Sequence, residues 1–574
     1  MKNIKILMMS FAAVATLGLS SCVQDLETTP IDPSIDLPQN ILTSEAAYEA
    51  LLAKCYQGLA CSSSDGANGG PDINGVDGGF GQYLRAYFNL QCLTTDEAVC
   101  CWNDTGLPDM HNMNWQASNQ FIVAMYYRIF YQVSLCNELI RQVNENPTGV
   151  EFQNKGVLIA EARALRALSY YHAVDMFGNV PFTTENDVVG NFFPNQISRA
   201  DLFDYVENEC KELIEGDDLA AEGTNVYGRC DKGFVKMILA KLYLNAEVYV
   251  GQDRYAECAA ICEDLVSKYN LQQSITIQVP AQAAKAAEDA EAGEGAEDGE
   301  DTGAGEGTED GEDDEVEMVD KVIDGFSMLF SADNHLCTAN ATFGANNEII
   351  FAVPHDGINT TSYGGTNFLI FAGTGGDMNA SEAGISSGWG GLSVTKQVAE
   401  LYAEGDVRAM FFTDYGTAIA DREVFTSGGY KSVKFRNVNH DGSAAQTTGF
   451  VDTDFPLFRV ADAHLMLAEC AARGKADHAK GLASLNAVRQ RAGLEAVTTF
   501  TAQDVLDERS RELLWEGHRR TDLIRFGQFT TDAYLWEYKG SPYDGKAVED
   551  HRNLFPLPPA DVNANGNLTQ NPGY

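Results

Sequence analysis

Apolar residues recur at helical spacing along most of the chain. Residues 43–60, 119–143 and 161–178 each place aliphatic and aromatic side chains on one broad face, and Thr43 or Ser44 can cap the first of these segments. The same pattern returns in residues 199–215, 232–249, 255–269, 458–474, 478–493 and 502–520. Successive amphipathic segments with short connectors predict a mainly α fold, in which helix pairs stack in a tetratricopeptide-like way.

The helical pattern is interrupted in two stretches, residues 61–118 and 326–455. Both contain loops rich in glycine and polar residues, and residues 348–357 and 430–437 have the composition of short strands. We therefore expect a single domain, residues 41–574, whose helical scaffold carries an irregular, loop-rich subdomain with short strands. Loops held on a rigid scaffold are where proteins commonly build a binding face.

The N-terminus has the composition of an export signal. Lys2 and Lys5 precede an apolar run that is too short and wrongly flanked for a membrane-spanning helix, and small residues then lead into Cys22. The ending Leu-Ser-Ser-Cys looks like a bacterial lipobox. We expect a signal peptide over residues 1–21, a diacylglycerol group on the Cys22 sulfur, and a tether over residues 22–40. Ordinary secretion with an incidental cysteine is the alternative.

The formal charge of −44 is not spread evenly along the chain. Residues 283–320 contain seventeen acidic residues and a single lysine, Lys285, with no aromatic residue. Such a segment cannot bury enough apolar area to offset its ordering entropy, so we expect a disordered, solvated insert. A calcium-binding role is the weaker alternative, because the ligand spacing of an EF-hand is absent. The acidity also makes nucleic acid an unsuitable partner.

The thirteen cysteines do not form a recognisable framework. Cys100 and Cys101 are neighbours, and Cys258 and Cys262 are one helical turn apart. A chain of this length can build a large core without disulfides. We interpret most cysteines as small buried hydrophobic residues, with a few pairs oxidised, and expect no zinc site because no second C-x-x-C pair is present.

Several blocks, taken in order, resemble one known family. They are AEARALRALSYYHAVDMFGNVPF, GRCDKGFVKMILAKLYLNAEVY, DTDFPLFRVADAHLMLAE, LNAVRQRAGL, ERSRELLWEGHRRTDLIRFGQF and LFPLPPADVNANGNLTQNPGY. In this order they resemble the SusD/RagB family of surface glycan-binding lipoproteins, over nearly the whole chain after the signal; the acidic insert has no counterpart. The resemblance implies a SusD-like helical scaffold, an outer-membrane cell-surface location, a SusC-like TonB-dependent transporter as partner, and no catalysis.

The loops resemble more narrowly a starch-binding member of that family. The resemblance implies an aromatic arc of Trp102, Tyr363 and Trp389, with Arg85 and Asp77 as polar partners of the sugar. The loop after Trp102 is one residue shorter here, so the hydroxyl-binding asparagine is either Asn103 or lost. The chemistry suits a sugar, because a pyranose ring packs its C–H face on an aromatic plane while its hydroxyls need directional partners. Arg85 and Asp77 could instead brace the loop as an ion pair.

The segment VDTDFP offers a weaker candidate for a cation site. Asp452 and Asp454 alternate across one residue and face the same side of an extended chain, where oxygen ligands could converge on calcium. The resemblance implies structural calcium near this motif, and no cofactor is otherwise required. The alternative, which we favour, is that these carboxylates cap the helix expected over residues 458–474.

The expected function is capture of α-glucan, such as starch or maltooligosaccharides, and its delivery to the transporter. The first alternative is a related protein that serves another glycan or a peptide transporter; a peptide lid would not need three converging aromatic rings. A glycoside hydrolase is a remote alternative, because adjacent Asp96 and Glu97 cannot flank one scissile bond. Four other acidic residues are interpreted as surface or inter-helix ion pairs: Glu161, Glu508, Glu512 and Glu516.

Overall fold

The computed structural model describes residues 38–187, 190, 192–280, 318–337 and 347–574. The expected signal peptide, the lipidated Cys22 and nearly all of the tether therefore lie outside the described residues, as does the acidic insert up to residue 317. Within the described part of the chain, no helix is both long and apolar enough to cross a membrane.

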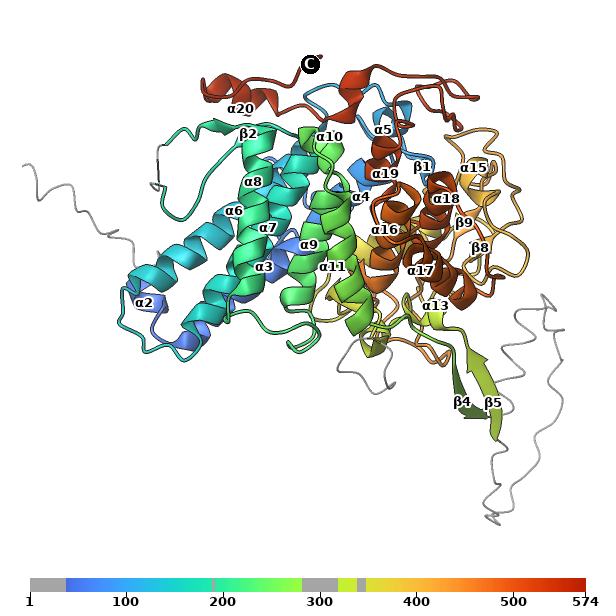
Figure 1. Cartoon of the computed structure of the whole chain (residues 1–574), viewed down its shortest axis with the longest axis horizontal. Coiled ribbons are helices and arrows are strands. Elements are labelled where there is room, and N and C mark those ends of the chain that lie inside the picture. The colour runs from blue at the N-terminus through green and yellow to red at the C-terminus, as the bar shows by residue number, and fades with distance from the viewer. Residues whose placement is uncertain (1–37, 188–189, 191, 281–317, 338–346) are drawn as a thin grey trace, which may run out of the picture.

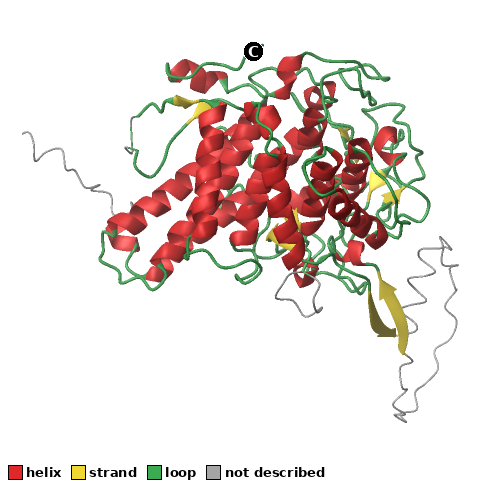
Figure 2. Ribbon diagram, in the orientation of Figure 1, coloured by secondary structure: helices red, strands yellow, loops and turns green. Residues whose placement is uncertain are grey.

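Helices dominate the molecule and pack in a continuous series (Figures 1 and 2). Each member of the series packs on the next one along the chain. The members are α6 (Gln120–Glu145), α7 (Lys155–Met176), α8 (Arg199–Glu215), α9 (Lys232–Leu244), α11 (Tyr255–Lys268), α16 (Val460–Ala472) and α17 (His478–Arg491), and α3 (Glu45–Ala60) covers α6 and α7. The mainly α, tetratricopeptide-like scaffold predicted from the hydrophobic pattern is confirmed.

Local signals in the sequence fix where several helices begin and end. The Ser198 side chain accepts the amide of Asp201, so α8 begins at the predicted residue. The expected helix over residues 232–249 is divided at Asn245, after which α10 (Ala246–Val250) begins.

The expected helix over residues 502–520 is likewise two helices. They are α18 (Ala502–Glu512) and α19 (Arg519–Arg525), and Trp515 and Gly517 take positive φ angles in the turn between them. Amphipathic periodicity continues through such a turn, so it does not reveal the break.

Shorter elements belong mostly to the loop-rich part. The helices are α2 (Pro38–Ile41), α4 (Tyr83–Gln91), α5 (Pro108–Asn112), α13 (Gly325–Met328), α14 (Gly365–Gly373), α15 (Lys396–Ala399) and α20 (Pro559–Ala564), with 3₁₀ turns at Asn334–Cys337 and Asp550–Asn553. The described strands form antiparallel pairs. The pairs are β1 (Val99–Cys100) with β7 (Leu392–Ser393), β2 (Val180–Pro181) with β3 (Gln196–Ile197), β4 (Ile275–Pro280) with β5 (Met318–Ile323), β6 (Ile349–Val353) with β10 (Phe455–Arg459), and β8 (Phe411–Phe412) with β9 (Lys431–Ser432).

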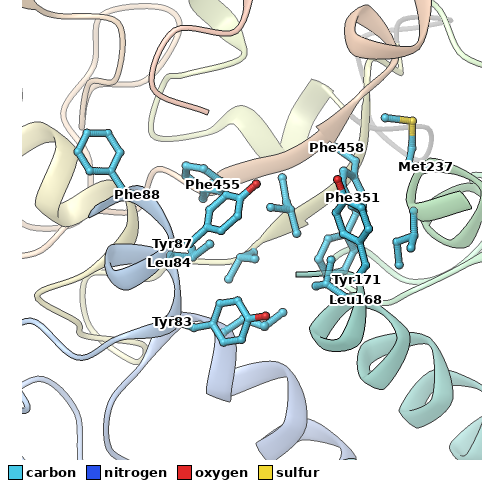
Figure 3. Close-up of a cluster of buried hydrophobic side chains, with 14 of the residues drawn as sticks. Tyr83, Leu84, Tyr87, Phe88, Leu168, Tyr171, Met237, Phe351, Phe455 and Phe458 are labelled. Carbon is cyan, nitrogen blue, oxygen red and sulfur yellow. The ribbon is translucent and has the colours of Figure 1, made fainter. Parts of the chain in front are cut away.

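One buried core joins the loops to the scaffold. Figure 3 shows aromatic side chains of α4, α7, β6 and β10 gathered in it. Phe234 of α9 contacts Phe351 of β6, with ring centroids 4.6 Å apart, and Phe458 of β10 at 5.4 Å. Both strands are buried along their whole length, so the loops that leave them start from fixed positions.

The acidic residues Glu508, Glu512 and Glu516 lie in the core. Arg459 bridges Glu512 at 2.9 Å and Glu516 at 2.7 Å, and Arg408 bridges Glu508 at 2.6 Å. The predicted ion pairs exist; of the two placements expected, at the surface or between helices, the surface placement is wrong because all three carboxylates are buried. Glu161 is buried too and pairs with Arg229 at 2.8 Å. Buried charges need such pairing to offset their desolvation.

The ribbon of β4 and β5 projects from the body of the molecule (Figure 1). Residues 318–320, which we assigned to the acidic insert, belong to β5, so that boundary was three residues too long. In β5 the exposed side chains of Met318, Asp320 and Val322 alternate with less exposed neighbours, as expected for a strand with one face toward solvent.

The twelve described cysteines are all free thiols, and all except Cys101 are buried. Their interpretation as small buried hydrophobic residues is confirmed. The expected oxidation of a few pairs is not seen: Cys258 and Cys262, for example, have their sulfur atoms 3.9 Å apart.

Candidate functional site

A buried helix, α14, forms the base of the candidate site. Tyr363 lies two residues before its first residue, and Trp389 is attached near its other end. The Trp389 amide donates to the Phe371 carbonyl at 2.6 Å, and the two rings are in contact, tilted by 37° with centroids 4.9 Å apart. The helix therefore sets the separation of Tyr363 and Trp389.

The pairing of β1 with β7 positions Trp102 next to Trp389. Cys100 stands opposite Leu392, so the chain directly after β1 runs beside the chain directly before β7. The Trp102 indole nitrogen donates to the Gly390 carbonyl at 3.0 Å. A β-carbon at Gly391 would lie 2.6 Å from the Trp102 ring, so only glycine allows this approach.

The three aromatic rings form a tilted series. Trp102 and Trp389 have centroids 6.4 Å apart with planes at 48°, and Trp389 and Tyr363 have centroids 6.2 Å apart with planes at 55°. All three side chains are partly exposed. The structure thus brings together the three rings that the sequence singled out; their role in binding stays a prediction.

Arg85, on α4, lies under this series. Its guanidinium donates to the Gly79 carbonyl at 2.6 Å and to the Tyr363 carbonyl at 3.3 Å. It also stacks over Phe368 at 4.3 Å and lies 5.9 Å from the Trp102 ring centroid. Burial lowers the pKa of Arg85 to about 10, which leaves it charged at neutral pH. Arg85 joins the loops beneath the rings.

Asp77 and Asn103 lie at the exposed rim. Asp77 accepts the Gly79 amide at 2.6 Å, so in this described turn it is linked to Arg85 through Gly79 and not by a direct ion pair. Asn103 follows Trp102 directly and is exposed. Both side chains are exposed, and their contact with a sugar stays a prediction.

Sequence reasoning missed three residues that contact Arg85 or Tyr363. Phe368 supports Arg85 from within α14. Asn68 accepts the Tyr363 hydroxyl at 2.9 Å. Phe450 contacts the Tyr363 ring with centroids 5.5 Å apart. Asn68 and Phe450 lie in loops without periodicity, so only the glycine-rich surroundings and the aromatic character of Phe450 could have drawn attention to them.

The expectation that Asp452 and Asp454 cap the next helix is wrong. Residues Phe455–Arg459 form β10, so α16 begins at Val460, six residues after Asp454, with Arg459 in the N-cap position. The hydrophobic period of the helix does extend into this strand, which concealed the boundary.

The carboxylates of the VDTD motif instead join loops. Asp454 accepts the Tyr227 hydroxyl and, at 2.7 Å, the His355 amide, and burial raises its pKa to about 7. Asp452 accepts the amides of Gly357 and Gln446, each at 2.8 Å.

These protein donors already bind the two carboxylates. Among the described residues, no three His, Cys, Asp or Glu side chains are grouped so that they could hold a metal ion. Calcium can also take backbone carbonyl, amide and water oxygens, so the ligand role of Asp452 and Asp454 stays a prediction.

The acidic pair before Trp102 is buried away from the rings. Asp96 binds Arg519 through two hydrogen bonds of 2.8 and 2.7 Å and accepts the Tyr534 hydroxyl at 2.7 Å. Glu97 lies in the core, and burial raises its pKa to about 8. Neither carboxylate faces a substrate on the ring surface, which is what a hydrolytic pair would require.

Comparison with known proteins agrees with this architecture. The model of the SusD family matches residues 409–574. The chain is 29% identical to the starch-binding protein SusD of Bacteroides thetaiotaomicron, in an alignment that covers 98% of this chain and 97% of that protein.

Solved structures share the fold over most of the chain. A SusD superfamily protein from Parabacteroides distasonis has a TM-score of 0.64 at 20% identity, over 92% of this chain and 99% of that one. Surface glycan-binding protein A from B. thetaiotaomicron, solved with laminarihexaose, has a TM-score of 0.61 at 18% identity, over 92% and 100% of the two chains. The family model, the full-length relative and the shared fold all point to similarity with the SusD family.

Proposed function

We propose that this protein captures α-glucan, such as starch or maltooligosaccharides, on the surface formed by Trp102, Trp389 and Tyr363. The observation that carries the proposal is the tilt between successive rings, 48° and 55°. Coplanar rings would suit a flat polysaccharide, whereas inclined rings suit a chain that curves, with one sugar face on each ring. The full-length relative named as starch-binding supports the same choice of ligand.

The proposed mechanism is binding without catalysis. In this proposal the rings supply apolar faces, and the exposed side chains of Asp77 and Asn103 supply polar partners for the sugar hydroxyls. Stacking spread over several rings gives each short ligand a modest affinity, which a polymer raises by engaging many copies of the protein.

The proposed setting is the cell surface. The lipobox-like sequence at Cys22 would anchor the protein to the outer membrane through lipid. A SusC-like TonB-dependent transporter would receive the glucan as the lipoprotein opens and closes over it. Similarity to the SusD family supports this assignment.

A polysaccharide panel tests the ligand. Affinity electrophoresis on amylopectin, laminarin and cellulose, with calorimetry on maltooligosaccharides, should show binding to the α-glucans. Trp389→Ala should abolish it, because this ring contacts both of the other two. Binding to laminarin or cellulose with none to amylopectin would refute the starch assignment and favour another glycan.

A further inference from the structure

A fourth aromatic side chain continues the ring series beyond Tyr363. Phe450 lies in the loop before β10, and its ring is 5.5 Å from that of Tyr363, centroid to centroid, with planes at 46°. The two preceding steps, from Trp102 to Trp389 and from Trp389 to Tyr363, have centroid separations of 6.4 and 6.2 Å at 48° and 55°. All three steps are therefore similar in length and inclination.

Hydrogen bonds to backbone carbonyls fix the loop of Phe450 to the loop of Trp389. The Ser386 amide donates to the Thr448 carbonyl at 3.2 Å. The Asn437 side-chain amide donates to the Thr447 carbonyl at 2.8 Å and to the Gly384 carbonyl at 3.0 Å. Phe450 thus holds a set position relative to Trp389, as a binding ring must.

The exposure of Phe450 matches that of the other three rings. It is partly exposed, and its neighbours Thr448 and Gly449 are exposed. The aromatic residues of the scaffold core, such as Phe234 and Phe458, are buried. A partly exposed ring in a polar loop leaves apolar surface that a sugar can cover.

We propose that Phe450 is a further stacking residue, which extends the glucan site by one subsite at the Tyr363 end. This inference rests on the proposed function. Exposed Asn68, which accepts the Tyr363 hydroxyl at 2.9 Å, places an amide beside the same subsite to bond sugar hydroxyls. The ligand is a glucan long enough to pass Tyr363, so the site favours longer oligosaccharides over short ones.

Calorimetry with two ligand lengths tests the proposal. Maltotriose supplies one sugar for each of Trp102, Trp389 and Tyr363, whereas maltoheptaose can also reach Phe450. Phe450→Ala should bind maltotriose as the wild type does and should bind maltoheptaose about three- to tenfold more weakly. Phe450→Leu, which keeps an apolar side chain in the loop, should show the same selective loss, and Phe450→Tyr should bind as the wild type does.

The controls separate this proposal from the function on which it rests. Phe193→Ala removes an exposed phenylalanine from a loop beside the C-terminal tail and should change neither affinity. Equal weakening for both ligands, or full maltoheptaose affinity in Phe450→Leu, would overturn the subsite and leave Phe450 as a loop anchor. If Trp389→Ala binds both ligands as well as the wild type does, the proposed function itself fails, and the subsite fails with it.

Discussion

The indole nitrogen of Trp102 donates a hydrogen bond to the carbonyl of Gly390, 288 residues further along the chain. This bond occupies the polar edge of the ring, so Trp102 can offer a ligand only its apolar surface. The adjacent bond from the Cys101 amide to the Gly391 carbonyl, 2.9 Å long, continues the β1–β7 pairing. The ring is therefore oriented before any ligand arrives, which reduces the entropy cost of binding.

Gly391→Ala should weaken glucan binding by displacing Trp102. The new β-carbon would lie 2.6 Å from the indole, so the Trp102 ring must shift from its present position. We expect a loss of about 1 kcal/mol in binding free energy, roughly fivefold in Kd, measured by calorimetry on maltoheptaose. Gly566→Ala, where a β-carbon meets no atom within 4 Å, is the matched control. Unchanged affinity in Gly391→Ala would show that the orientation of Trp102 is unimportant.

Arg85→Lys should loosen the site although the charge is kept. Lysine lacks the planar fork that bonds the carbonyls of Gly79 and Tyr363 while stacking on Phe368. We expect a fall in stability of about 1–2 kcal/mol in chemical denaturation, together with weaker glucan binding. Arg141 forms a partly exposed ion pair with Glu138, and Arg141→Lys should change neither the stability nor the glucan binding. Wild-type behaviour of Arg85→Lys would mean that Arg85 does not hold the loops.

Glu97→Gln should change how stability depends on pH. Burial raises the pKa of Glu97 from about 4.5 to about 8, so the folded protein keeps a proton that the unfolded chain loses above pH 4.5. The contribution of the Glu97 carboxyl to the free energy of unfolding is therefore lost as pH rises from about 4.5 to about 8, by at most about 1.4 kcal/mol per pH unit.

The difference in thermal midpoint between Glu97→Gln and the wild type reports this effect. Glutamine cannot ionise, so the variant should become more stable relative to the wild type as pH rises from about 4.5 to about 8. Above pH 8 the difference in thermal midpoint should stay constant. Glu495→Gln, at an exposed position, should follow the wild-type profile. A constant difference from pH 5 to pH 8 would contradict the raised pKa.

Cys22→Ala should release the protein from the membrane. Metabolic labelling with a radioactive fatty acid should mark the wild type and leave the variant unlabelled, and the variant should move to the soluble fraction. Cys101→Ala, the partly exposed cysteine of the described region, should label as the wild type does. Labelling of the Cys22 variant would place the lipid elsewhere or refute the lipobox.

The fold follows from sequence periodicity to a large extent, because apolar spacing and capping residues act locally. Residues 199–215 form a helix as predicted, with Ser198 as its cap. The failures come from tertiary contacts. The local sequence does not show that Glu512 pairs with Arg459, which belongs to another element, so its burial is missed. It also does not show that β10 follows Asp454, so the residue is mistaken for a helix cap.

In the candidate site, too, residues recognisable in the local sequence could be predicted, and long-range contacts could not. Trp102, Tyr363 and Trp389 could be named from resemblance, since their loops carry recognisable residues. The proximity of Phe450 to Tyr363 could not, because it depends on the hydrogen bond between Ser386 and Thr448 and on no local pattern. The function of Arg85 as a link between loops also needs the three-dimensional positions of the carbonyls that it binds.

Attachment of the rings to the two ends of α14 has a mechanical consequence. Tyr363 and Trp389 cannot separate while this helix is intact, and Trp102 is bonded to the same loop as Trp389. Any motion of the protein relative to a transporter would therefore carry the rings as one rigid body, with the glucan still bound. Release would then have to come from competition by the receiving protein for the sugar, because α14 keeps the separation of the rings fixed.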